Sequence, residues 1–138
     1  QLFRVGPAEV KYAYKILNRH VFKNQLRRPP IEMGVTRDYW GLCIGMDNET
    51  APGTSSIIKI SDKYFCLHWF MNVLAHEMAH QYQWDIVGPS REDRGMEPLL
   101  SHGPTFFMWR EEFEYYGLHL KTAHSRRLWF EHQDFHKC

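Results

Sequence analysis

The chain has 138 residues, with 17 basic and 16 acidic side chains and a formal net charge of +1. This length fits one domain with a substantial hydrophobic core, so we treat residues 1–138 as a single domain with 119–138 as a C-terminal extension. The near balance of charge excludes a strong overall field that would draw the protein to nucleic acid or to a membrane surface.

The cysteines Cys43, Cys66 and Cys138 include no pair at the C-x-x-C spacing. This excludes a cysteine zinc ribbon and favours a reducing compartment without a disulfide framework. No signal peptide and no uninterrupted apolar run long enough to span a membrane is visible. We therefore expect a soluble monomer in the cytoplasm or nucleus, with no membrane partner.

The first predicted element is a helix that begins at Gly6-Pro7, because proline suits the first helical turn. Its apolar residues recur at helical spacing and should pack on a sheet: Val10, Tyr14, Leu17 and Val21. Arg27-Arg28-Pro29-Pro30 should end this helix, since paired prolines cannot continue it. We interpret its two arginines as part of a solvated turn rather than as a phosphate contact.

Three strands are predicted next, at Ile31–Thr36, Gly41–Met46 and Ser55–Ser61, from β-branched residues and apolar alternation. The turn-forming segment Asp47–Gly53 joins the second strand to the third. Connections this short predict an antiparallel meander, a small three-stranded sheet in which strands adjacent in sequence pair with one another, and hence an α+β fold. In the second strand the alternating apolar residues are Leu42, Ile44 and Met46. Cys43, between them, is interpreted as an inert structural thiol.

The long apolar run from Cys66 to Val87, stopped by Gly88-Pro89, predicts a largely buried helix that contains His76-Glu77-Met78-Ala79-His80. Residues i and i+4 share a helix face, so His76 and His80 can point at one ion. In this H-E-x-x-H pattern two histidines hold zinc, and the glutamate, here Glu77, acts as general base toward a metal-bound water. Histidines on a solvated face are the alternative, but buried ionisable groups are costly unless paired or bound to metal.

A third metal ligand is expected, because catalytic zinc usually takes three protein ligands and keeps one position for water. A second active-site helix should run from Pro104 to about Tyr116 and end at Gly117, which places His102 at its start. His102 is the favoured ligand because it adjoins a rigid element. The carboxylates of the polar loop Gly88–Ser101 remain open as alternatives: Glu92, Asp93 and Glu97.

His76-Glu77-Met78-Ala79-His80, followed by a polar loop and His102-Gly103-Pro104-Thr105-Phe106, resembles the SprT-like metalloprotease family, which includes the Spartan branch. Trp40-Gly41-Leu42-Cys43 is also similar to that family's pattern, and the resemblance extends from the first helix to Tyr116. It implies a small zincin-like domain, zinc on His76, His80 and His102, and Glu77 as catalytic base. It also implies a protease that acts on proteins crosslinked to DNA.

The last segment, His119–Cys138, mixes basic and aromatic residues. Lys121, Arg126, Arg127 and Trp129 could make weak contacts with single-stranded DNA through phosphates and base stacking. We favour instead a terminal helix that docks Leu128, Trp129 and Phe135 on the core. The residues with workable spacing for a second metal are His132, His136 and Cys138, but no fourth ligand is obvious.

Together these patterns predict a zinc-dependent endopeptidase with a protein or peptide substrate, bound in extended form along the sheet edge at Ser55–Ser61. The loop Gly88–Ser101 is a candidate lid. Two other classes stay open: a non-catalytic, zinc-stabilised DNA-associated adaptor and a hydrolase of non-protein substrates. The sequence does not choose the oxyanion-stabilising donor among its candidates, which are Tyr64, His68, Tyr82, Arg91 and Arg94.

Overall fold

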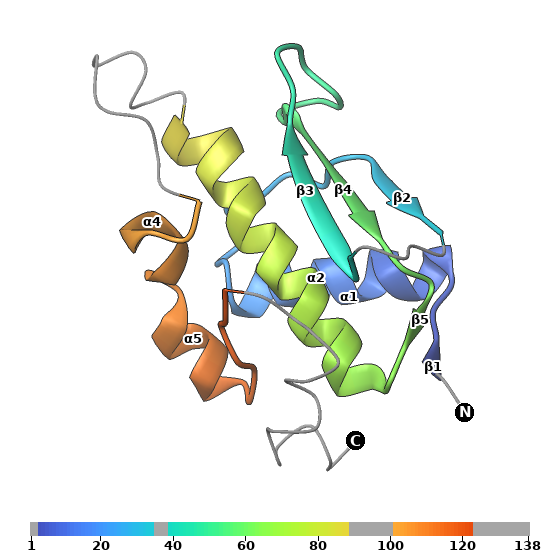
Figure 1. The fold of residues 1–138 in the computed structure, drawn as a ribbon. Coiled ribbons are helices and arrows are strands. Elements are labelled where there is room, and N and C mark those ends of the chain that lie inside the picture. Colours follow the sequence, from blue (N-terminus) through green and yellow to red (C-terminus); the bar gives the residue numbers. More distant parts are fainter. Residues whose placement is uncertain (1–2, 35–38, 89–100, 123–138) are drawn as a thin grey trace.

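The structure is a computed structural model that describes residues 3–34, 39–88 and 101–122. A long helix, α2 (Leu67–Tyr82), lies in the middle, with the sheet on one side and the short helices α4 and α5 on the other (Figure 1). This arrangement confirms the α+β class. In chain order the other elements are β1 (Phe3–Arg4), α1 (Pro7–His20), β2 (Ile31–Met33), β3 (Gly41–Gly45), β4 (Ser56–Ile60), β5 (Lys63–Tyr64), the π-helical segment η1 (Gln83–Val87), α4 (Pro104–Phe107) and α5 (Arg110–Tyr115).

The helix α1 begins as predicted, with Gly6 at the N-cap and Pro7 in the first turn. It ends at His20, before the double proline, so the predicted cause of its end is wrong. The chain turns away at Lys23 and Asn24, whose φ angles of 56° and 61° lie in the left-handed region. All four residues of the predicted stripe are confirmed in the core, and α1 packs against α2.

The sheet is mixed, with strand order β2-β4-β3. β3 pairs with β4 antiparallel, whereas β2 pairs with β4 in parallel. The predicted antiparallel three-stranded sheet is therefore wrong in the direction of one strand and in its order. β4, the last of the three in sequence, occupies the centre because its isoleucines Ile58 and Ile60 are fully buried beneath α2. A separate antiparallel pair joins β1 to β5.

The face of β3 that meets α2 is the one that carries Gly41, Cys43 and Gly45. A Cβ atom added to Gly41 would lie 2.8 Å from Cγ1 of Val73 on α2, so only glycine permits this approach. Leu42, on the opposite face, is exposed, as is Met46 just beyond the strand. The apolar alternation in this strand therefore marks the outer face, and the close approach of α2 to the backbone selects the inner one.

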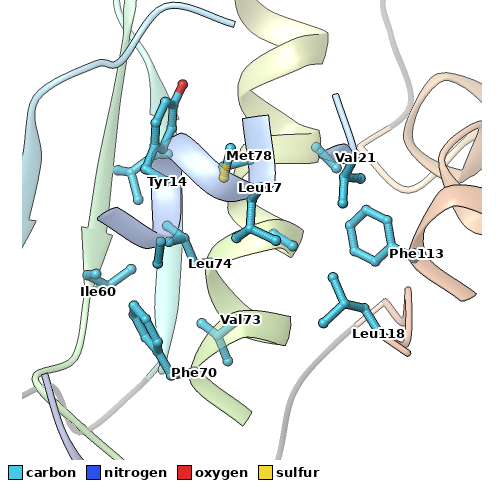
Figure 2. Close-up of a cluster of buried hydrophobic side chains, with 14 of the residues drawn as sticks. Tyr14, Leu17, Val21, Ile60, Phe70, Val73, Leu74, Met78, Phe113 and Leu118 are labelled. Atoms are coloured by element: carbon cyan, nitrogen blue, oxygen red, sulfur yellow. The ribbon is translucent and has the colours of Figure 1, made fainter. Parts of the chain in front are cut away.

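The core lies where α1, α2, β4 and α5 meet, and Figure 2 shows their side chains converging between the ribbons. Its labelled members are Tyr14, Leu17, Val21, Ile60, Phe70, Val73, Leu74, Met78, Phe113 and Leu118. The start of the expected C-terminal extension joins this body, since Leu120 is buried and the His119 N–H donates to Asn72 Oδ1 at 2.6 Å. Among the described residues, no helix is both long enough and apolar enough to cross a membrane.

The predicted apolar helix is confirmed across Leu67–Val87, although its last turn, η1, is π-helical. The second active-site helix is not continuous as predicted. Its residues form the two short helices α4 and α5, separated at Met108 and Trp109, and Gly117, with a φ angle of +76°, follows the second one. The break turns α5 onto the core while α4 stays beside α2.

The cysteines differ in state. Cys43 is a free thiol whose pKa is raised, chiefly by burial and also by the nearby carboxylates of Glu77 and Asp85. This disfavours the thiolate that a nucleophile would need. Cys66 caps the start of α2, where its Sγ accepts the Trp69 N–H, and it is disulfide-bonded. The expectation of a chain without disulfides is therefore wrong at Cys66.

Candidate metal centre

Three histidines converge beside α2: His76 and His80, one turn apart on that helix, and His102, just before α4. Each offers a ring nitrogen, and these ligand atoms all lie within 4.8 Å of one another. The Nε2 atoms of His80 and His102 are 3.2 Å apart. The chain thus brings together the three predicted ligands in a group that could hold a metal ion.

The sequence around His102 explains how it reaches α2. Gly103 caps α4, and its carbonyl accepts the N–H groups of Phe106 and Phe107 at 3.0 Å each. This short turn drives the fully buried Phe106 ring under the site. The ring stacks on His80 with centroids 4.5 Å apart and lies 4.9 Å from the rings of His76 and His102. Phe106 therefore forms an apolar floor that all three imidazoles share.

The environment of these histidines suits metal binding. Burial lowers the pKa of His80 and, alone, that of His102, so the neutral imidazole is favoured in both. For His80 the hydrogen bond that its ring makes to the side-chain oxygen of Gln83 raises the pKa and opposes this effect, and the neighbouring His102 lowers the pKa further. The neutral ring is the form that coordinates a metal, and imidazole nitrogens are ligands that zinc commonly takes. The donor set therefore fits zinc in both chemistry and protonation state.

Glu77, between the two helical histidines, is buried beside this group. Burial raises the pKa of its carboxyl group to about 8. The backbone of Gly41 on β3 lies against it, since a Cβ atom added there would be 3.0 Å from Glu77 Oε2. A nearby cation would favour the carboxylate form. The site thus holds a buried carboxyl group whose neutral form is favoured by burial and whose ionised form a cation would favour.

A cleft of about 430 Å³ opens over the histidines. One wall is the segment 39–43 at the start of β3, and the opposite wall comes from α2, Ser101 and His102. Trp84 lines it from η1 and stays half exposed. Within the described chain β3 is an edge strand, so the cleft runs beside an unpaired backbone edge. The complete lining is Tyr39, Trp40, Gly41, Leu42, Cys43, Val73, His76, Glu77, His80, Trp84, Ser101, His102 and Thr122.

Sequence reasoning missed two residues that support the site. The side-chain oxygen of Gln83 lies 2.9 Å from Nδ1 of His80, and its amide nitrogen donates to Thr105 Oγ1 at 3.0 Å. A glutamine three positions after a ligand, on the same helix face, is a signal that could have found this contact. Thr105 lies within the HGPTF segment but carried no role in the prediction.

The predicted oxyanion donors are not at the cleft where the structure describes them. Tyr64 is fully buried and donates to the Trp40 carbonyl at 3.2 Å, and Tyr82 packs edge-on against the Trp109 ring. His68 does not line the cleft either. The hydroxyl-bearing residues that do line it are Tyr39, Ser101 and Thr122.

Several predicted residues lie outside the described part of the chain. They include the alternative ligands Glu92, Asp93 and Glu97, the oxyanion candidates Arg91 and Arg94, and the candidate lid 89–100. In the C-terminal segment, Lys121 is described and exposed. The remaining predicted nucleic-acid, docking and second-metal residues also lie outside: Arg126, Arg127, Leu128, Trp129, His132, Phe135, His136 and Cys138.

Comparison with known proteins adds no relative to this picture. No protein-family model matches the chain, and no curated protein sequence matches it. The resemblance to the SprT-like family therefore depends on the H-E-x-x-H and HGPTF residues themselves. What is established is a three-histidine group, with a buried glutamate beside it, at the wall of a cleft.

Proposed function

We propose that the protein is a zinc-dependent endopeptidase of the SprT-like kind. The observation that supports it most is the convergence of His76, His80 and His102 beside the buried Glu77 in an open cleft. Three histidines leave a coordination position of tetrahedral zinc for water or substrate, as catalytic zinc sites do. A structural zinc site is instead closed by four protein ligands.

In the proposed peptide hydrolysis, different residues of the cleft have different roles. His76, His80 and His102 would hold the zinc, which when bound would supply Lewis-acid activation of the scissile carbonyl and of a water molecule. Glu77 takes the proton of the attacking water and delivers it to the leaving amine. Phe106 covers the imidazoles on one side and the backbone of Gly41 covers one side of Glu77. Tyr39, in the cleft wall, is the proposed donor to the developing oxyanion.

We further propose that substrate binds in extended form along β3. The earlier expectation of β4 is wrong, because β4 is the central strand and both its edges are paired. Trp40 bonds to Ser61 and Met46 to Ser55, so the even-numbered residues of β3 point their backbone groups at β4. The N–H and C=O groups of Gly41, Cys43 and Gly45 consequently face the open edge. Backbone pairing there binds chains with little regard to their side chains.

The family resemblance supports a narrower proposal, that the substrates are DNA-associated or DNA-crosslinked proteins. The alternative is a non-catalytic, zinc-stabilised adaptor that associates with DNA. A cleft of about 430 Å³ that reaches Glu77 and the histidines favours the enzyme over the adaptor, because an adaptor needs no substrate access to its metal. Cleavage of a protein substrate with and without single-stranded DNA addresses both ideas, and equal rates would reject dependence on DNA.

The decisive experiment compares wild type with Glu77→Gln in a casein cleavage assay, with the zinc content of each protein measured in parallel. We expect Glu77→Gln to retain zinc and lose cleavage by several orders of magnitude, since the amide cannot accept the proton. Glu114→Gln, which alters an exposed glutamate on α5, is the matched control and should cleave like wild type. Undiminished cleavage by zinc-loaded Glu77→Gln would refute the base role.

A further inference from the structure

We propose that Gln83 is a positioning residue of the metal centre, which sets the tautomer of His80 and ties the His102 segment to α2. This inference extends the proposed function, because it assumes that the three histidines hold zinc. It concerns metal binding, however, and does not depend on what the protein cleaves. The argument follows from the two hydrogen bonds of one buried amide.

The first bond decides which nitrogen of His80 can bind a metal. A neutral imidazole carries one N–H donor and one lone pair, and the partner of one nitrogen determines the role of the other. Gln83 Oε1, 2.9 Å from His80 Nδ1, can only accept, so Nδ1 carries the hydrogen. Nε2 then presents its lone pair toward Nε2 of His102, 3.2 Å away. Metal-bound histidines commonly depend on such an outer partner for orientation and basicity.

The second bond reaches the other ligand segment. The side-chain amide of Gln83 donates to Thr105 Oγ1 at 3.0 Å, and Thr105 follows His102 by three residues in the turn that opens α4. A threonine hydroxyl accepts or donates, so this bond alone would permit either orientation of the amide. Only the orientation with Oε1 toward His80 leaves Nε2 of His80 able to bind a metal. The two bonds together therefore couple the ligand on α2 to the ligand before α4.

Burial and backbone geometry make this role specific to Gln83. Its side chain is 4% exposed, so water does not compete for its hydrogen bonds. The regular helix also changes here, because the Gln83 N–H contacts the carbonyls of both Ala79 and His80 and η1 begins at this residue. Insertions of this π-helical kind are frequent at functional sites.

The same helix offers a matched control in Gln81, which is also buried but faces away from the histidines. Its amide nitrogen donates to the Arg27 carbonyl at 2.6 Å and to Asp85 Oδ2 at 3.0 Å, and its oxygen accepts the Tyr14 hydroxyl at 2.8 Å. Gln81→Met should therefore lower the stability of the fold without changing the metal site. The two glutamines separate a loss of buried hydrogen bonds in general from a loss of the bond to His80.

The test measures zinc affinity by competition with a chromophoric chelator for four proteins: wild type, Gln83→Met, Gln83→Glu and Gln81→Met. We expect Gln83→Met to bind zinc about 10–100-fold more weakly than wild type. Gln83→Glu should restore the affinity to near the wild-type value, because a carboxylate accepts from Nδ1 as the amide does. Gln81→Met should bind zinc like wild type while it unfolds at a lower temperature.

Wild-type affinity in Gln83→Met, or affinity in Gln83→Glu as weak as in Gln83→Met, would overturn the proposal, since the amide would then only fill space. If Gln83→Met does not fold, Gln83→Asn replaces it, because the shorter amide cannot reach both partners. The outcomes of this test also distinguish failure of this inference from failure of the proposed function. Zinc binding that depends on Gln83 without any proteolysis would refute the endopeptidase alone, and failure of wild type to bind zinc would refute both.

Discussion

The buried carboxyl group of Glu77 makes a quantitative prediction about stability. Burial raises its pKa from the ordinary value of 4.5 to about 8, with no other cause contributing. The perturbation is Glu77→Gln, which keeps the shape of the side chain and removes its ability to ionise. Both proteins are studied free of metal, because a bound cation would itself favour the carboxylate.

The size and sign of the effect follow from linkage between folding and protonation. The folded state holds the Glu77 proton more tightly than the unfolded chain, so rising pH destabilises wild type between about 4.5 and about 8. Each pKa unit corresponds to about 1.4 kcal/mol, which makes the full loss on the order of 5 kcal/mol. Below this window the two proteins should be nearly equal in stability, and above it their difference should level off.

The assay is urea denaturation of metal-free wild type and Glu77→Gln from about pH 5 to about pH 9. The histidines titrate in both proteins, so their contribution cancels in the difference between the two free energies of unfolding. We expect the free energy of unfolding of Glu77→Gln, relative to that of wild type, to rise steadily through this range. A difference that stays constant with pH would show that the carboxyl group is not buried as described, and it would refute the reasoning.

Three further predictions concern the cleft and the proposed zinc. Gly41→Ala should lower the free energy of unfolding by about 1–3 kcal/mol and reduce proteolysis, because the new Cβ would press on Val73 and on Glu77 Oε2. Unfolding in urea at the wild-type concentration would contradict this contact. Gly45→Ala should displace Trp84, because the added Cβ would overlap the indole ring, and the tryptophan fluorescence maximum should shift; Trp84→Phe is the control that lacks this signal. Removal of zinc with a chelator should lower the melting temperature and abolish cleavage, and return of zinc should restore both. The stabilisation should grow with the logarithm of the zinc concentration, and a melting temperature that does not respond to zinc would argue against metal binding by the folded state.

Local patterns were sufficient for the start of α1 and for the helical segment that carries His76 and His80, because their signals lie within a few residues. Gly6-Pro7 begins α1, and the apolar spacing that follows identifies its buried face. The apolar run to Val87 likewise predicts the extent of the helical segment that carries the histidines. Where α1 ends was harder to predict, since the turn at Lys23 and Asn24 uses left-handed backbone without the glycine that usually signals it.

The sheet shows what such patterns cannot supply. Strand direction and order depend on which partner each edge meets, so the parallel pairing of β2 with β4 left no mark in the spacing of the strands. The apolar pattern of β3 was misleading for a related reason, because its alternating apolar residues do not identify the face that α2 covers. Its glycines, which look like poor strand formers, are the residues that let α2 lie against the backbone.

The sequence by itself determined that two imidazoles can meet at one point, because the four-residue spacing of His76 and His80 places both on one helix face wherever that helix lies. The choice of His102 as third partner was also predicted, but only the tertiary structure brought it within reach. It did so by inserting Phe106 beneath the imidazoles and by joining the two segments through Gln83. Packing likewise decided that the edge strand beside the histidines is β3, since strand order is a property of the folded chain and not of local spacing.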